Sequence, residues 1–402
     1  MPLVYDPSDE QVRRNPFPLY ERLQDDDPVH WSEALRCWVV TRYDDVRAVA
    51  MSGDVSPNRL TPFYERLRDE RREILSEVIR YLNLWLVFRD PPEHTRLRRL
   101  LNGVFTLEAI AAMQPRIAAV VEDVLAGIDA TRPVDLVREF AMLVPGYVIL
   151  DLLGIPRERF AEVKAWSDDM RTFIGTSRDE PDKYRRARRG ADAMSAFFRE
   201  LIAMRRADPG EDFVSRMIAA RDDADALSED ELVATCMLVL FGGHETTTNL
   251  IANAVNALLD HPEQLARLRG EPGIVETAVE EFLRYDGPSN SIARVVRTGH
   301  ELGGRRLREG DRIFAMINAA NRDPRRFERP HALDLGRTPN RHLTFGQGIH
   351  FCLGAPLARL EGRVALGILA ERFPRMRRAG GEPEWVDALI MRGLSSLPVA
   401  LG

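Results

Sequence analysis

The chain has 402 residues, of which 45% are hydrophobic and 29% charged, and its formal net charge is −6. The apolar fraction is ample for a large buried core, and charges that nearly cancel give no general attraction to nucleic acid or to an anionic membrane. Three widely spaced cysteines, Cys37, Cys236 and Cys352, argue against a disulfide framework and fit a reducing cytosol.

The amino-terminal region lacks the apolar segment of a signal peptide. The longest apolar run in a helical context, 232–241, is too short to cross a bilayer, so we expect a cytoplasmic protein that does not enter a membrane. PVHW and RCWVVT flank SEAL and predict a β-hairpin, whereas residues 54–87 match no motif.

Helical periodicity dominates the rest of the chain. It predicts helices over 15–24, 107–128, 191–206, 228–259 and 353–373. HELGGRRL and DRIFAMI, near residue 305, predict a second hairpin, and LIMRGLSSLPVAL a third. The fold class is therefore mainly α with a minor β portion, and because no Pro/Gly/Ser-rich linker divides the chain, we expect one domain over 1–402.

The segment DPPEHTRLRRL begins with prolines that suit the first turn of a helix. His94 and Arg98 are four residues apart and therefore share one helix face. A single arginine at such a position most often lies in solvent.

A long helix is predicted from the capping box at 228–231 to the punctuation Asp-His-Pro at 260–262. Its middle, FGGHETTTN, is rich in poor helix formers. A hydrogen bond from Thr246 back to the carbonyl of Gly242 would open the helix and leave a groove for a small molecule beside Glu245. The alternative is a kink in a core helix, with Glu245 reaching solvent.

A further helix ends at YDGP, and its last turns contain Glu281 and Arg284, which share one face. As an isolated pair these two residues would form a surface ion pair that contributes little to stability.

Cys352 stands in FGQGIHFCLGAPLARLE, directly before a helical pattern. Backbone N–H groups at a helix start favour a thiolate, and Gly346, Gly348 and Gly354 allow a tight loop that a flat ligand can approach. Such a thiolate can be an axial ligand of haem iron. The alternatives are a buried, inert cysteine and a phosphate-binding GxGxxG, whose third glycine is replaced by Phe351.

Together these motifs resemble the cytochrome P450 superfamily in its soluble bacterial form. FGQGIHFCLG matches the haem-binding signature of that family, EFLR resembles its ExxR pair, and GGHET resembles its distal-helix motif, with Gly242 where alanine is most common. The resemblance implies a P450-like fold, with haem b between the long distal helix and the helix that follows the cysteine loop.

The resemblance also implies roles for individual residues. Cys352 would be the proximal iron ligand with Phe345 packed near the sulfur, Thr246 would hydrogen-bond dioxygen at the iron, and Glu245 would relay protons. Glu281 and Arg284 would be structural, with a further partner in 321–329, and His244 would belong to packing. The implied haem contacts are His94, Arg98, Arg294, His350, Phe345, Gly354 and Gly242.

By the same resemblance, the substrate walls come from 54–87, 170–174, 240–243, 289–292 and 394–397. The expected ligand is hydrophobic with one or more polar groups, such as a polyketide, terpenoid, steroid or fatty acid. The candidate lining residues are Leu84, Trp85, Phe173, Leu240, Gly243, Ser289, Asn290, Leu394 and Ser395.

The implied activity is insertion of one oxygen atom from O2 into a lipophilic substrate by a monomeric enzyme. No flavin or iron–sulfur motif is found, so electrons from NAD(P)H would arrive through a ferredoxin reductase and an acidic ferredoxin. The basic segment 96–99, near Arg359 by family likeness, is a candidate docking face, although a solvated helix face is the alternative. Two rival functions are a peroxide-driven peroxygenase and a non-enzymatic haem-thiolate sensor or carrier.

Overall fold

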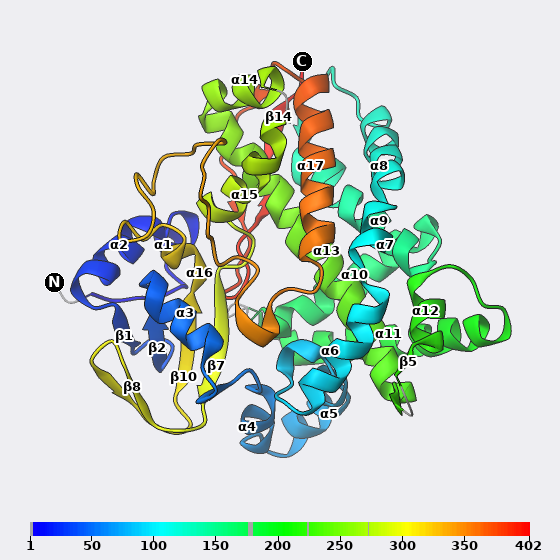
Figure 1. Ribbon diagram of the computed structural model, residues 1–402, viewed down its shortest axis with the longest axis vertical. Helices are drawn as coiled ribbons and strands as arrows, with labels where there is room; N and C mark the ends of the chain where they lie inside the picture. Colours follow the sequence, from blue (N-terminus) through cyan, green and yellow to red (C-terminus); the bar gives the residue numbers. More distant parts are fainter. Residues whose placement is uncertain (1–2, 176–179, 223–224, 272) are drawn as a thin grey trace. The chain divides into compact units, whose positions relative to one another are not determined.

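The computed structural model describes residues 3–175, 180–222, 225–271 and 273–402 (Figure 1). The chain forms two compact units, the first made of Met1–Val55, Met113–Pro145 and Glu245–Gly402, and the second of Ser56–Ala112 and Gly146–His244. The unit boundaries cut through α9 (Leu143–Leu153) and α13 (Glu229–Asp260), so each of these helices belongs to both units. A single functional domain over 1–402 stays a prediction.

The first unit contains a mixed sheet of strand order β1-β2-β10-β7-β3. The β1–β2 pair is antiparallel and confirms the first predicted hairpin, while β10 runs parallel to β2 and antiparallel to β7. Val40, Val46 and Ile313 belong to the apolar core between this sheet and α3. The bounds are β1 Val29–Ser32, β2 Cys37–Val40, α3 Tyr43–Met51, β3 Val55–Ser56, β7 Ser291–Val296 and β10 Arg312–Met316.

The other two predicted hairpins are wrong. HELGGRRL forms a hairpin by itself, because Gly303 and Gly304 have φ of 52° and 76° and close a two-residue turn between β8 and β9. DRIFAMI is instead β10 of the main sheet. At the carboxyl end, β13 pairs with β12, and β14 with β11 and β4. The bounds are β4 Val134–Asp135, β8 His300–Leu302, β9 Arg305–Leu307, β11 Arg377–Arg378, β12 Glu384–Trp385, β13 Leu394–Ser396 and β14 Pro398–Ala400.

In the first unit α17 packs against α8, α14 and α15, whereas α16 packs against α2 and α3. The helix predicted over 353–373 is α17, although it begins only at Ala355. The helices and helical turns of this unit are α1 Glu10–Arg14, α2 Phe17–Asp26, α8 Gln114–Ala126, η2 Val137–Ala141, α14 Pro262–Gly270, α15 Ile274–Tyr285, α16 Ile317–Ala320, η4 Gly348–His350 and α17 Ala355–Arg372.

The second unit is mainly helical, and its long helix α11 packs against α5, α10 and α12. The helix predicted over 191–206 is the carboxyl-terminal part of α11, whereas the one predicted over 107–128 is two helices, α7 and α8, because Pro115 lies in the first turn of the second. The elements are α4 Leu60–Glu65, α5 Asp69–Leu82, η1 Leu86–Phe88, α6 Glu93–Val104, α7 Leu107–Ala111, η3 Arg157–Arg159, α10 Phe160–Ile174, α11 Lys183–Ala207, α12 Phe213–Ala219, β5 Arg221–Asp222 and β6 Asp225–Ala226.

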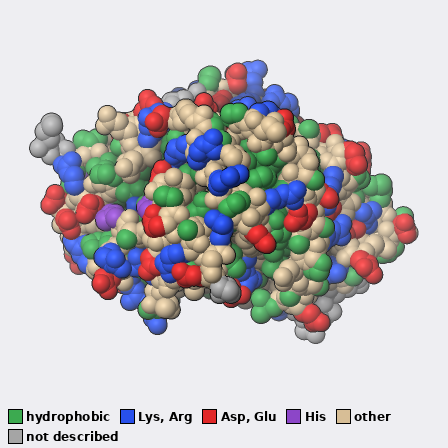
Figure 2. Space-filling model, turned by 90° about the horizontal axis from the view of Figure 1, so that it is seen from above, with side chains coloured by type: hydrophobic (Ala, Val, Ile, Leu, Met, Phe, Trp, Pro, Cys, Tyr) green, Lys and Arg blue, Asp and Glu red, His purple; other side chains and the backbone are tan. Residues whose placement is uncertain are grey.

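The helices outnumber and outsize the strands, which confirms the predicted fold class. Among the described residues no single helix is long and apolar enough to span a membrane; one bent pair, Glu93–Val104 with Leu107–Ala126, meets the criteria of length and composition. Figure 2 shows acidic and basic side chains interspersed over one face, in keeping with a net charge of only −6.

Candidate active site

The cysteine loop, residues 345–354, brings four predicted site residues together: Phe345, His350, Cys352 and Gly354. Gly346 and Gly348 have φ of 73° and 69°, the left-handed conformation that favours glycine. The N–H of Cys352 donates to the carbonyl of Phe345 at 2.8 Å, which closes the loop. Cys352 is exposed and forms no disulfide, so the alternative of a buried, inert thiol is excluded.

The pair Glu281 and Arg284 anchors the chain that leads to this loop. Both side chains are 0% exposed, and Arg284 donates to both carboxylate oxygens of Glu281, at 2.7 and 2.8 Å, so they are not a surface ion pair. Arg284 also donates to the carbonyls of Asn321, Pro330 and Ala332.

The further partner expected in 321–329 is only partly there. Asn321 accepts through its carbonyl, and the ring of Phe327 lies 5.5 Å from the guanidinium of Arg284. The charged partner is Arg337, which lies beyond that segment and donates to Glu281 at 3.1 Å. Asn340 donates to the same carboxylate. The expectation was too narrow because the irregular stretch before the cysteine loop has no periodicity to mark these two residues.

The long helix α13 runs without interruption through FGGHETTTN. Its capping box is confirmed, because Glu231 N–H donates to Ser228 Oγ and Ser228 N–H donates to Glu231 Oε2. Glu245 is only 7% exposed, so the alternative in which it reaches solvent is excluded. Thr246 is half-buried, and His244 is buried with its Nδ1–H donated to the carbonyl of Leu240 at 2.7 Å.

Two glycines in the middle of α13 have different surroundings. Gly243 packs against Ile149 of α9 in the second unit, so a side chain there would collide with Ile149. Gly242 is exposed directly after the buried Phe241, and a Cβ atom at position 242 would meet nothing within 4 Å. The backbone at Gly242 can therefore be approached by a flat ligand.

In the second unit, His94 and Arg98 lie four residues apart on α6, as predicted. His94 is buried, and this burial is the main cause that lowers its pKa. The positive charge of Arg98 also lowers the pKa of His94, whereas the negative charge of Asp90 raises it. Arg98 is half-buried and donates to Asn102 Oδ1 at 3.2 Å. Because the pKa of His94 is lowered, Arg98 is the member of this pair that carries the positive charge an anionic group would need.

The predicted substrate residues of the second unit lie in apolar surroundings. Trp85 is 2% exposed, and its ring lies 5.5 Å from that of Phe241. Its Nε1–H is buried without a hydrogen-bond partner among the described residues. Phe173 packs against the rings of Phe63 and Tyr184, whereas Leu84 is half-buried and Leu240 fully buried.

The predicted substrate and haem residues of the first unit differ in their burial and in their hydrogen-bond partners. Asn290 is buried and accepts from Tyr20 Oη while donating to the carbonyl of Leu389, so its amide is engaged within the protein. Ser289 forms a β-bridge with Met391. Leu394 is buried, Ser395 donates to the carbonyl of Glu384, and Arg294 on β7 donates to the carbonyl of Ala293.

The residues present fit a haem in two respects. The thiol of Cys352 is exposed in a loop before α17, and a Cβ atom at Gly354, the N-cap of that helix, would meet nothing within 4 Å. The bare backbone at Gly242 gives a second surface suited to a planar group. No cluster of three or more His, Cys, Asp or Glu side chains offers an alternative metal centre within the described part of the chain.

Three residues that form a network beside the cysteine loop were missed as site residues, and two of them, His342 and Arg359, contact Phe345 of the loop. His342, before the loop, and Glu280, beside Glu281, form a hydrogen bond of 3.1 Å. Arg359, noted only for its position near a docking face, donates to Glu280 at 2.6 and 2.9 Å. Spacing alone allowed either glutamate to pair with Arg284, so the sequence offered no signal for the second network.

Known proteins resemble this chain over nearly its whole length. The family model described as cytochrome P450 matches residues 68–377. The polyketide biosynthesis cytochrome P450 PksS of Bacillus subtilis (strain 168) is 35% identical over 411 residues, covering 99% of each chain. The vitamin D(3) 25-hydroxylase of Pseudonocardia autotrophica is 38% identical over 396 residues, covering 97% of this chain and 94% of that protein.

Solved structures give the same result. P450BioI, in a crystal with an acyl carrier protein ligated to hexadec-9Z-enoic acid, matches with a TM-score of 0.90 and 32% identity, over 98% of this chain and 99% of that one. The chain belongs to the cytochrome P450 family. It is a monooxygenase whose cofactor is haem b, which this family binds through a cysteine thiolate.

Proposed function

We propose that Cys352 is the axial ligand of the haem and that the enzyme inserts one oxygen atom of O2 into a C–H or C=C bond of a lipophilic substrate. The observation that carries this proposal is the exposed thiol of Cys352 in a glycine-shaped loop before α17. When bound, haem supplies the centre at which O2 is reduced and one of its atoms is transferred. Two electrons and two protons convert the other oxygen atom to water.

The protons are delivered from α13. Glu245 is buried and its neighbour Thr246 half-buried, so a carboxylate and a hydroxyl stand side by side within a helix that shields them from bulk water. Glu245 would relay protons into the site, and the hydroxyl of Thr246 would donate a hydrogen bond to dioxygen. Within the cysteine loop, Phe345 packs beside the ligand sulfur.

Four residues would hold the two haem propionates, the arginines through charge and the histidines through N–H groups. His94 and Arg98 on α6, Arg294 on β7 and His350 in the cysteine loop take this role. A buried carboxylate without a partner costs several kcal/mol, so these contacts contribute to haem retention.

The substrate is hydrophobic with one or more polar groups: a polyketide, terpenoid, steroid or fatty acid, in secondary metabolism. Support comes from the apolar setting of Leu84, Trp85, Phe173 and Leu240 in the second unit. Gly243, Ser289, Asn290, Leu394 and Ser395 complete the proposed walls. The names of the relatives, a polyketide enzyme and a vitamin D hydroxylase, agree with a lipophilic substrate, as does the fatty acid in the P450BioI crystal.

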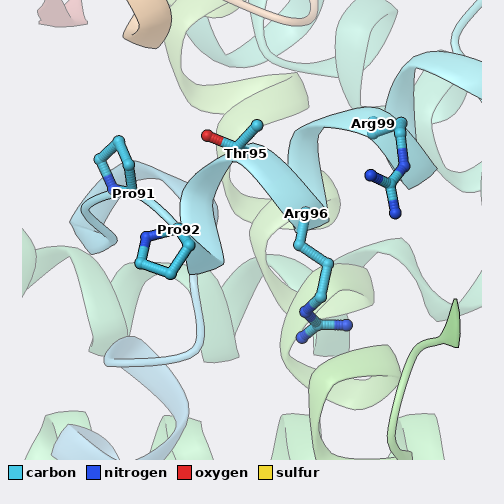
Figure 3. Close-up of a pocket in the computed structure, with 5 residues that line it drawn as sticks. All are labelled: Pro91, Pro92, Thr95, Arg96 and Arg99. Carbon is cyan, nitrogen blue, oxygen red and sulfur yellow. The ribbon is translucent and has the colours of Figure 1, made fainter.

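Electrons come from NAD(P)H through a ferredoxin reductase and an acidic ferredoxin, which docks on α6 of a monomeric, cytoplasmic enzyme. Pro91, Pro92, Thr95, Arg96 and Arg99 line an open surface pocket there (Figure 3). Arg99 also lines a second surface pocket with Arg216 of α12. Arg99 and Arg216 are exposed and suit an acidic protein partner, whereas Arg96 is half-buried and forms an ion pair with Glu231.

The decisive experiment is reconstitution. With ferredoxin, reductase and a substrate that displaces the iron-bound water, NADH consumption should depend on substrate and yield a product that carries one atom from ¹⁸O2. Product formed from peroxide alone, with none from NADH, would establish the rival peroxygenase; no product under either condition would favour a haem-thiolate sensor or carrier. Cys352→Ala should lose the strongly red-shifted Soret band of the reduced carbon monoxide complex, and retention of the band would disprove the ligand assignment.

A further inference from the structure

Two ion pairs join α15 to α17, one helical turn apart. In the outer pair, Glu276 Oε1 lies 3.2 Å from Arg363 Nη1, and the side chain of Glu276 is 70% exposed. In the inner pair, Arg359 donates from Nε and Nη2 to the two oxygens of Glu280, at 2.6 and 2.9 Å, and Glu280 is only 27% exposed. The two pairs have the same chemistry and join the same helices, but only the inner pair contacts the cysteine loop and the residues just before it.

The inner pair reaches the chain before the loop through His342, whose side chain is 3% exposed. The N–H of Thr344 donates to Nδ1 of His342 at 3.2 Å, which leaves the ring proton on Nε2. Nε2 therefore donates to Glu280 Oε2, at 3.1 Å. The carboxylate of Glu280 thus accepts hydrogen bonds from the imidazole of His342, which precedes the loop, and from the guanidinium of Arg359 on α17.

Arg359 reaches the loop directly. Its guanidinium carbon lies 4.4 Å from the centroid of the Phe345 ring, within the range of a cation–π contact. The same ring lies 5.9 Å from that of His342. The carbonyl of Phe345 accepts the N–H of Cys352. Phe345 therefore connects the backbone of the cysteine to both His342 and Arg359.

We propose that Glu280, His342 and Arg359 are positioning residues for the thiolate: together they fix Phe345, and through it the orientation of Cys352, while the opposite charges of Glu280 and Arg359 balance each other beside the ligand loop. The proposal rests on the assignment of Cys352 as the ligand. It is distinct from the Glu281–Arg284 cluster, which contacts other segments and leaves Phe345 untouched.

The reduction potential of the haem distinguishes the proposed role from a simple loss of stability, because it responds to nearby charge. Reduction of ferric to ferrous haem adds an electron, so a nearby cation favours it and a nearby anion opposes it. Glu280→Gln leaves the charge of Arg359 unbalanced and should move the reduction potential in the positive direction. Arg359→Gln leaves the charge of Glu280 unbalanced and should move it in the negative direction, and the double variant should return close to the wild-type value.

The positioning role predicts a second readout. In Glu280→Gln and Arg359→Gln, the thiolate Soret band of the reduced carbon monoxide complex should decay faster at moderate temperature, by about tenfold, because hydrogen bonds to a charged partner are lost. Arg359→Lys keeps the charge but not the planar, two-pronged contact. This variant should retain the wild-type potential and still lose the band faster.

Glu276→Gln and Arg363→Gln are the matched controls, and both should keep the wild-type potential and decay rate. Potentials that move in the same direction in the two inner variants, or shifts no larger than in the controls, would overturn the proposal. If Glu280→Gln fails to take up haem, the decay of the Soret band is compared between Arg359→Lys and Arg363→Lys. Faster decay only in Arg359→Lys supports the proposal, and equal decay overturns it. Cys352→Ala distinguishes the ligand assignment from the positioning role. If Cys352→Ala keeps the thiolate Soret band, the ligand assignment is wrong. If it loses the band while the Glu280 and Arg359 variants behave like wild type, only the positioning role is wrong.

Discussion

Thr246 is half-buried directly after the buried carboxyl of Glu245, and its hydroxyl is the group that α13 offers at the proposed proton-delivery site. Thr246→Ala removes this hydroxyl and little volume. We expect NADH consumption to continue while product per NADH falls and peroxide rises, because a misdirected proton releases reduced oxygen before transfer. Product, peroxide and NADH measured together test this, with Thr247→Ala as control; unchanged product per NADH would contradict the role of Thr246.

Arg98 can be tested without any substrate. In Arg98→Leu the proposed propionate site loses its charged partner on α6, and the loss of one partner of a buried ion pair costs several kcal/mol. We expect a lower haem-to-protein ratio in the purified variant and a lower melting temperature of the holoenzyme. Arg99→Leu, which changes an exposed arginine one position further along α6, serves as the control. Full haem occupancy with unchanged melting in Arg98→Leu would remove this residue from the haem site.

At the scale of elements, the Glu281 cluster fastens α15 to the irregular chain over 330–340. Glu281→Gln would leave Arg284 and Arg337 with two positive charges around a neutral amide, at a position that is 0% exposed. Removing one partner of a buried ion pair costs about 3–5 kcal/mol. Denaturant unfolding should show a loss of that order, whereas Glu276→Gln on the same helix should change stability by less than about 0.5 kcal/mol. Equal stability of the two variants would mean that the cluster is dispensable.

The α15–α17 contact also makes stability depend on pH. Burial alone would raise the pKa of Glu280, but hydrogen bonds from His342 and Arg359 lower it to about 2, from 4.5. Because the folded pKa is depressed, the stabilisation is complete above about pH 4.5 and is lost as the pH falls towards 2. The stability difference between wild type and Glu280→Gln should therefore shrink between pH 5 and pH 3. A constant difference across that range would contradict the depressed pKa.

How far the sequence predicts these elements depends on how local their determinants are. The start and end of α13 could be predicted, because a capping box and an Asp-His-Pro sequence act within a few residues. The β8–β9 hairpin lies wholly within HELGGRRL, and Gly303-Gly304 is a local turn signal, but the whole segment was predicted as one strand paired with DRIFAMI. The pairing of β10 with β2 joins segments far apart in the chain, and no local pattern encodes it.

The same distinction between local and long-range determinants applies to the residues of the site. The motif residues of the cysteine loop could be found because a fixed spacing identifies them, and Glu281–Arg284 because both belong to one helix. Arg337 and His342 come from irregular chain, and only the fold brings them to the carboxylates of α15. Their roles depend on tertiary contacts, which hydrophobic periodicity does not report.

At the scale of the whole molecule, association with an electron donor is a question of surface charge. Arg99 is exposed on α6, and Arg99→Glu should slow reduction by an acidic ferredoxin while leaving the haem spectrum and substrate affinity unchanged. Added salt should slow the wild type and narrow the difference, because exposed charges are screened over about 10 Å at 0.1 M. Stopped-flow reduction at several ionic strengths measures this, with Arg269→Glu on α14 as control. Identical rates for wild type and Arg99→Glu at low salt would place docking elsewhere.

The course of the chain between its two units constrains how the enzyme can be rebuilt. The chain passes from one unit to the other four times, and two of these passages lie inside α9 and α13. Transplanting the second unit from a relative would thus require four junctions, two of them within a continuous helix, where a mismatch in side-chain register is carried along every later turn. Diversification of substrate range is therefore expected by point substitution within each unit, and a chimera is best joined at 112–113, the passage that lies between α7 and α8, because the passage at 55–56 lies within β3.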